Sequence, residues 1–187
     1  MKVGFKPSGL DQCLFYGNGM IVLVYVDDWL FFGPDLAKID QMIARLQKEE
    51  KMTLTVEKED TYAFLGVDVK PNDKGGYTMT QEGLINKVLK TVDMEGGGKN
   101  ATPAEVSPLG SDGNGKPFAA PWGYASVIGM LLYLSSNSRP DIQFAVHQCA
   151  RFTHNPEESH MIAIKRICRY LKATSDKGLE FTPTNQM

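Results

Sequence analysis

The sequence predicts an α+β fold, with strands and hairpins in about the first 80 residues and helices in most of the rest. Residues 20–26 (MIVLVYV) are a continuous apolar run of strand length, and a second apolar run at 29–32 follows Asp27-Asp28. Two such runs around a pair of turn-forming residues are typical of a β-hairpin. Beyond residue 121 helical periodicity takes over. The composition, 42% hydrophobic and 22% charged, allows a buried core.

Each further element follows from local signals. Apolar side chains at helical spacing after Asp35, a good N-cap, predict a helix over residues 35–50. Pro140 and Pro156 fit the first turns of two later helices. Three glycines in succession and a polar run make residues 95–121 a long loop or linker. The other expected elements are strands at 13–16, 64–70 and 77–80, turns at 17–19 and 72–76, and helices at 81–92, 122–136, 140–153 and 156–174.

Charge and cysteine content exclude several classes of protein. The net charge of −2 gives no overall basic field. Three scattered cysteines argue against a disulfide framework and for a reducing compartment. No apolar run reaches the roughly 18 residues that a membrane span needs, and the N-terminus lacks a signal-peptide core. We therefore expect an intracellular protein that does not cross a membrane.

Asp27 and Asp28 are the strongest candidates for chemistry. Neighbouring side chains of a strand point to opposite faces, but a tight turn lets two adjacent carboxylates converge. Such a pair suits Mg²⁺, a hard cation that prefers oxygen ligands, and two ions about 3.5–4 Å apart can catalyse phosphoryl transfer. The structural alternative is that Asp-Asp is simply a favourable turn, because aspartate bonds its own backbone. Spacing alone favours that alternative.

Several motifs in family order change the balance. Tyr25-Val26-Asp27-Asp28 resembles the YVDD motif of copia-type retrotransposon reverse transcriptases, and Phe64-Leu65-Gly66-Val67 resembles their FLGI strand. Further matching positions are Gly4-Phe5, Ser8, Asp11, Cys13-Leu14-Phe15, Thr102-Pro103, Tyr124, Ser126, Ile128-Gly129, Leu131, Tyr133-Leu134, Arg139-Pro140-Asp141-Ile142, Ala145-Val146, Arg151-Phe152, Pro156, His160, Arg169-Tyr170-Leu171, Thr174 and Gly178-Leu179. The resemblance covers nearly the whole chain.

The resemblance implies a role for each residue of the hairpin. Asp27 and Asp28 would be catalytic ligands of Mg²⁺ or Mn²⁺, with Tyr25 beneath the primer terminus and Val26 as the small residue between. The family also has a third metal-binding aspartate on an upstream strand, for which no position before residue 20 is a candidate. We therefore expect a fragment of an RNA-directed DNA polymerase that is inactive by itself.

The resemblance also implies a domain plan and partners. Residues 1–80 would be part of the palm, 81–154 a helical thumb and 155–187 the start of a connection segment. Phe64, Leu65 and Gly66 would shape the primer grip, on which an RNA template paired with a DNA primer rests; dNTP is the substrate of the intact enzyme. The cytoplasm, a virus-like particle or the nucleus would be the location. Two alternatives stay open: a non-catalytic duplex-binding remnant, and a decayed coding fragment.

Two side-chain groups near the C-terminus have competing interpretations. Lys165, Arg166, Arg169 and Lys172 form a basic stripe on the last helix, which either contacts nucleic-acid phosphates or is an ordinary solvated face. Cys149, His154, His160 and Cys168 can be drawn as a zinc set, but their spacing differs from that of structural zinc sites. For Cys168 we expect a place in the core.

Overall fold

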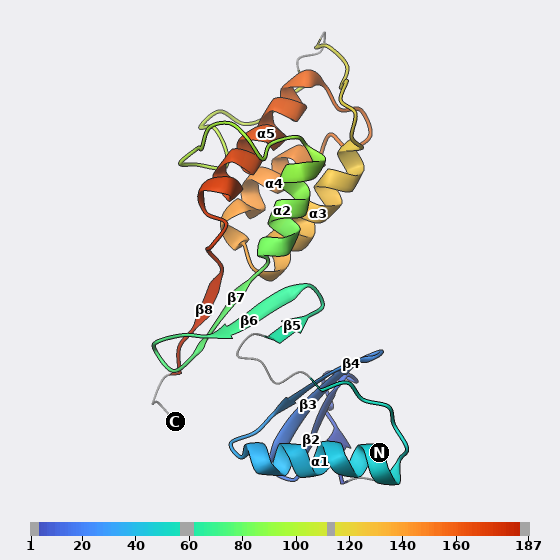
Figure 1. The fold of residues 1–187 in the computed structure, drawn as a ribbon. Coiled ribbons are helices and arrows are strands. Elements are labelled where there is room, and N and C mark those ends of the chain that lie inside the picture. The colour runs from blue at the N-terminus through green and yellow to red at the C-terminus, as the bar shows by residue number, and fades with distance from the viewer. Residues whose placement is uncertain (1–3, 57–61, 112–114, 184–187) are drawn as a thin grey trace. The chain divides into compact units, whose positions relative to one another are not determined.

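Residues 4–56, 62–111 and 115–183 are described by a computed structural model. The chain divides into two units, residues 1–59 and residues 60–187. The first unit combines antiparallel strands with one helix, and the second combines them with several (Figure 1). Each unit has its own hydrophobic core. The predicted α+β class is therefore confirmed. In the part of the chain that is described, no helix is long and apolar enough to cross a membrane.

The first unit is a four-stranded antiparallel sheet, in the order β1-β2-β3-β4, with one helix on it. Its elements are β1 (Lys6–Pro7), β2 (Leu14–Gly17), β3 (Met20–Tyr25), β4 (Asp28–Phe32) and α1 (Leu36–Glu49). Met20 and Val22 lie on one face of β3 and are buried with Ile39, Met42 and Leu46 of α1. The strands, hairpin and helix expected in this region are confirmed. They pack together because the alternating buried residues of β3 face the apolar stripe of α1.

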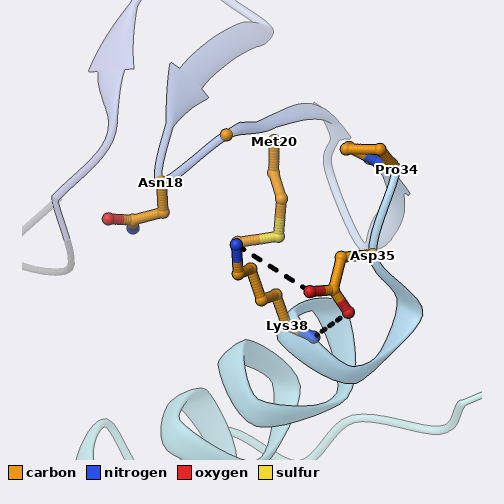
Figure 2. A pocket seen from close by; sticks show the side chains of 6 residues that line it. Asn18, Met20, Pro34, Asp35 and Lys38 are labelled. Atoms are coloured by element: carbon orange, nitrogen blue, oxygen red, sulfur yellow. Dashed lines mark hydrogen bonds and ion pairs between the residues drawn. The ribbon is translucent and has the colours of Figure 1, made fainter.

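The start of α1 is fixed by the residue that the sequence indicates. The Asp35 Oδ1 atom accepts hydrogen bonds from the amides of Ala37 and Lys38, at 3.0 and 3.3 Å. Its Oδ2 atom lies 3.8 Å from Lys38 Nζ (Figure 2). These contacts confirm Asp35 as the N-cap. The small pocket of Figure 2 adjoins Met20, at the end of β3 away from Tyr25, so it is not part of the Asp27-Asp28 turn.

The second unit joins a four-stranded antiparallel sheet, in the order β5-β6-β7-β8, to a bundle of helices. Its elements are β5 (Tyr62–Phe64), β6 (Val67–Pro71), β7 (Tyr77–Thr80), α2 (Glu82–Thr91), α3 (Tyr124–Asn137), the 3₁₀ helix η1 (Pro140–Ile142), α4 (Gln143–Ala150), α5 (Glu158–Ala173) and β8 (Leu179–Phe181). Fully buried side chains of all four α-helices, such as Ile85, Leu131, Val146 and Ile164, form the core.

Some boundaries of the second unit differ from those predicted. The single strand expected over residues 64–70 is wrong, because a turn at Leu65-Gly66 divides it into β5 and β6. Pro140 does open a helical turn, but Pro156 precedes the α5 N-cap, Glu157. Strand β8 has no clear sequence signal and forms because the chain returns along β7. Residues 95–111 and 115–121 contain no helix or strand, as the loop prediction requires.

The buried side chain of Arg139 is the centre of a hydrogen-bond network. The Arg139 side chain is 1% exposed, and its guanidinium bonds both Asp141 carboxylate oxygens at 3.0 and 2.8 Å. It also donates to the Thr174 carbonyl and hydroxyl at 2.9 and 2.6 Å. The Tyr170 hydroxyl completes the network by donating to Asp141 at 2.7 Å. Arg139 thereby joins η1 to the C-terminal end of α5.

Candidate metal site and nucleic-acid interface

The two candidate carboxylates lie where β3 turns into β4. Tyr25 pairs with Asp28 in the strand register, which leaves Val26 and Asp27 as a two-residue loop. Paired residues share a sheet face, so Asp28 lies on the same face as Tyr25, whose side chain is 50% exposed. Asp27 and Asp28 are both exposed. The hairpin therefore presents two neighbouring carboxylates to solvent at one end of the sheet.

Val26 has an unfavourable backbone conformation in this loop. Its φ of 53° lies in the left-handed region, where a β-branched residue is a true outlier. The side chain is 80% exposed, so burial does not compensate. Strain of this kind costs of order 1–3 kcal/mol and is found mainly at functional sites.

Two other hairpins of the described residues have two-residue loops, and one of them shows which residue types form such a loop without strain. The loop between β2 and β3 is Asn18-Gly19, with φ of 55° and 73°, and these are the residue types that such hairpin loops favour. The loop between β5 and β6 is Leu65-Gly66, with φ of 51° and 72°, and again places a large apolar residue in the left-handed region. The two loops with unfavourable residues are the two that the family motifs single out.

The contacts of Asp27 and Asp28 differ from those of aspartates that stabilise turns. Asp11 accepts a hydrogen bond from the Cys13 amide at 2.8 Å, and Asp35 caps α1. Within the described residues, neither the Asp27 side chain nor the Asp28 side chain makes a hydrogen bond or an ion pair. Asp27 and Asp28 thus lack the backbone bonds on which the turn-former interpretation depends.

The chemistry of the Asp27 and Asp28 side chains can be compared with what a divalent cation needs. Exposed carboxylate oxygens are ligands of the type that Mg²⁺ and Mn²⁺ accept. No group of three or more histidine, cysteine, aspartate or glutamate side chains with metal-binding geometry occurs in the described residues. Asp27 and Asp28 are therefore two side chains of a kind that could bind such an ion, and the described part of this chain places no third beside them.

The predicted primer-grip residues form a hairpin turn whose carbonyls are held by the helical part of the same unit. Phe64 pairs with Val67, so Leu65 and Gly66 form the loop. The Leu65 carbonyl accepts a hydrogen bond from the Tyr133 hydroxyl at 2.5 Å. The Gly66 carbonyl accepts one from Gln81 Nε2 at 3.2 Å. The amides of Leu65 and Gly66 have no acceptor among the described residues, and both residues are exposed.

The basic stripe of α5 is divided by its contacts with the loop that precedes α3. Arg166 donates to Glu105 and Thr102, each at 3.0 Å. Lys172 donates to the carbonyl of Glu95 at 2.5 Å. These two residues therefore hold the loop against α5.

The other two residues of the stripe are free of such contacts. Lys165 and Arg169 make no side-chain hydrogen bond or ion pair within the described residues. Both are partly exposed on α5. Of the four residues predicted to contact the nucleic-acid backbone, these are the two whose charge is not already committed.

The cysteine and histidine side chains near α5 have structural surroundings. Burial raises the pKa of the Cys149 and Cys168 thiols to about 12, so neither is a thiolate at neutral pH. The core position expected for Cys168 is confirmed by its 0% exposure. Both His160 ring nitrogens have partners, because Nδ1 accepts from the Glu157 amide and Nε2 faces the Gly110 carbonyl at 3.0 Å.

Sequence reasoning did not identify Tyr133 and Gln81 as part of the second hairpin. The signal for Tyr133 was weak, since an aromatic residue on an apolar helix is usually a core residue. For Gln81 the signal was its place just before a helix, where a polar side chain often finds a backbone partner. Neither signal names the carbonyl that is bound, because the contacts span 68 and 15 residues.

Comparison with known proteins places these features in a family. Residues 1–106 match the family described as reverse transcriptase (RNA-dependent DNA polymerase). The Pol polyprotein of transposon RE2 from Arabidopsis thaliana is 32% identical over an alignment of 183 positions, which covers 96% of this chain and 12% of the polyprotein. That of transposon TNT 1-94 from Nicotiana tabacum is 30% identical over an alignment of 185 positions, which covers 91% of this chain and 14% of the polyprotein.

A shorter relative covers the chain completely. A Ty5-1 transposon protein from Saccharomyces cerevisiae is 27% identical over an alignment of 198 positions, which covers 100% of this chain and 61% of that protein. No solved structure matches the chain. The chain thus spans about an eighth of the length of the first two polyproteins, as the 12% and 14% coverages show.

Proposed function

Since the chain belongs to the reverse transcriptase (RNA-dependent DNA polymerase) family, of the copia type, we propose that it is the part of that enzyme that carries the metal-binding hairpin and the primer-supporting hairpin. In this proposal residues 1–80 are late palm, residues 81–154 are thumb and residues 155–187 begin the connection segment. Its partners are an RNA template and a DNA primer, with dNTP as substrate of the complete enzyme. An intracellular location is part of the same proposal.

The observation that carries the proposal is the strained, exposed turn at Tyr25–Asp28. A chain that needed only a tight hairpin would have no reason to keep Val26 in the left-handed region, since Asn18-Gly19 forms a two-residue loop from residues that favour positive φ. Departures from locally favourable residues are expected where function sets the conformation. The turn exposes two carboxylates that accept no hydrogen bond from the described backbone.

The chemistry assigned to this turn is metal-dependent nucleotidyl transfer. Mg²⁺ or Mn²⁺ bound by Asp27 and Asp28 would stabilise negative charge on the phosphoryl oxygens. Tyr25 and Asp28 share one sheet face, so a primer end resting on the exposed ring of Tyr25 would lie beside the ligands. Because two carboxylates are fewer ligands than a two-metal site needs, we expect the 187-residue chain to be inactive unless a further ligand is supplied.

The second hairpin would support the primer strand through its backbone. The Leu65 and Gly66 carbonyls are already bound within the protein, whereas their amides have no acceptor among the described residues. Exposed amides are suitable donors to phosphate oxygens, and such contacts position a duplex without reading its sequence. Phe64, which is half-buried, forms the base of this loop.

The first test separates a metal site from a structural turn. We compare unfolding of the wild type, Asp27→Asn and Asp28→Asn in EDTA. If the carboxylates repel one another without metal, each variant should change the free energy of unfolding of the first unit by less than about 0.5 kcal/mol, or raise it. Asp35→Ala is the control and should cost about 1 kcal/mol, because Asp35 caps α1. A loss of about 1 kcal/mol in both asparagine variants would support a structural turn.

A non-catalytic duplex-binding role is the second candidate. It is favoured by Lys165 and Arg169, which lie one turn apart on α5 without partners among the described residues. Two uncommitted cations on one helix face can contact neighbouring phosphates. This role does not need Asp27, so binding that survives Asp27→Asn in EDTA would separate it from catalysis.

A further inference from the structure

The Leu65-Gly66 turn lacks the residues that would hold its conformation by themselves. Both residues have positive φ, which is the pattern of a type I′ turn, and asparagine rather than leucine is favoured at the first position. A leucine there raises the energy of the turn. The turn must therefore be held by contacts with other elements, or it would sample other conformations.

Those contacts come from the N-terminal end of α2 and the C-terminal end of α3. Tyr133 lies in the last turns of α3, and its hydroxyl donates to the Leu65 carbonyl at 2.5 Å. Gln81 immediately precedes α2 and donates to the Gly66 carbonyl at 3.2 Å. Its Oε1 atom accepts from the hydroxyl of Ser138, which caps the C-terminal end of α3, at 2.7 Å. Both turn carbonyls are thus tied, directly or through one side chain, to the same end of α3.

The exposure of these side chains indicates which of them contribute to folding and which affects only the turn. Gln81 and Ser138 are each 1% exposed, so they belong to the packed interior and contribute to folding. Tyr133 is 41% exposed, and its ring is not part of the core. An exposed tyrosine that keeps one hydrogen bond to a strained loop affects that loop far more than it affects global folding.

We propose that Tyr133 is a positioning residue for the primer-supporting hairpin: its hydroxyl holds the Leu65-Gly66 turn so that the turn amides face the primer strand. That the turn supports a primer rests on the proposed function, but the hydrogen bond from Tyr133 to the turn is a property of this chain. It makes α3 the element that sets the position of the turn. A duplex that shifts α3 would shift the turn with it.

The hold is tested in the full chain without nucleic acid. Tyr133→Phe removes only the hydroxyl, and Tyr77→Phe is the matched control, because Tyr77 is 49% exposed on β7 and its hydroxyl has no partner among the described residues. Amide hydrogen exchange of Phe64 and Val67, which pair across the turn, is followed by NMR. Loss of one ordinary hydrogen bond should speed local exchange roughly 2- to 12-fold in Tyr133→Phe. The amides of the helix core, and Tyr77→Phe throughout, should not change.

Binding of a nucleic-acid duplex tests whether this hydrogen bond matters for recognition of a primer end. Binding of an RNA–DNA hybrid with a recessed DNA 3′ end is compared with binding of a blunt hybrid of equal length. The wild type and Tyr77→Phe should prefer the recessed end, and Tyr133→Phe should lose that preference several-fold while binding the blunt hybrid as before.

The two readouts distinguish the possible failures. Unchanged exchange at Phe64 and Val67 in Tyr133→Phe would overturn the assignment, as would a full preference for the recessed end in that variant. A wild type without any preference would overturn the proposed primer-supporting function. In that case faster exchange in Tyr133→Phe would still show that the hydroxyl holds the turn, but no longer for a primer.

Discussion

Replacing Val26 by asparagine should stabilise the first unit by about 1 kcal/mol. The left-handed conformation costs a residue with a β-carbon roughly 1–2 kcal/mol, and asparagine tolerates it much better. Val26 is 80% exposed, so only a fifth of its side chain is removed from water. Complete burial of a valine is worth roughly 1.5–3 kcal/mol, so the packing lost in Val26→Asn is about 0.3–0.6 kcal/mol. Relief of strain therefore exceeds loss of packing.

The two tryptophans allow this prediction to be measured in one unit at a time. Trp29 lies in β4 of the first unit, and Trp122 lies in the second unit. Urea unfolding followed by fluorescence in a Trp122→Phe background then reports the first unit alone. Asn18→Val is the reciprocal control, because Asn18 has a φ of 55° in the neighbouring loop. It should lose at least about 1 kcal/mol. A Val26→Asn variant no more stable than the wild type would refute the strain argument.

Three further predictions concern activity, binding and the buried network. Primer extension on an RNA template with Mg²⁺ or Mn²⁺ should give no product above background with this chain, and extension abolished by Asp27→Asn would contradict that expectation. Lys165→Glu with Arg169→Glu should weaken binding to an RNA–DNA hybrid and make the slope of log affinity against log salt shallower by about 2, whereas an unchanged slope would identify a solvated face. Asp141→Asn should cost about 3 kcal/mol in urea unfolding, because it leaves the Arg139 charge, which is 1% exposed, without its carboxylate partner. Arg139→Met should cost only about 2 kcal/mol, because the carboxylate that it leaves unpaired is 38% exposed. Equal costs would be inconsistent with that difference in exposure. Burial raises the pKa of Asp141, but hydrogen bonds from Arg139 and Tyr170 outweigh it, so the pKa lies below its ordinary value of 3.8. The contribution of Asp141 to stability should therefore be present at neutral pH and fall away as the pH drops below 3.8.

The sequence predicts elements well where local chemistry decides them. Strand β3 and helix α1 follow from an apolar run and from the Asp35 cap, and both are found at the expected residues. The long loop before α3 follows from its glycines and polar residues. In each case the signal lies within a few residues of the element that it predicts.

Elements that depend on distant contacts could not be predicted in the same way. Strand β8 exists because residues 179–181 pair with β7, about a hundred residues earlier in the chain. The Leu65-Gly66 turn is held by Tyr133, and leucine gives no local sign of a turn. The basic stripe looked uniform in sequence, but the fold commits Arg166 to the loop before α3. Long-range hydrogen bonds and pairing, rather than propensity, decided these features.

Binding of Mn²⁺ tests most directly whether Asp27 and Asp28 hold a divalent cation. Substoichiometric Mn²⁺ should broaden the amide NMR signals of residues 25–28 before any others, because a paramagnetic ion relaxes the nuclei closest to it. Asp27→Asn should abolish that selectivity, whereas Asp11→Asn, at an exposed aspartate of the same unit, should preserve it. Broadening that starts elsewhere, or that is the same in Asp27→Asn as in the wild type, would contradict the assignment.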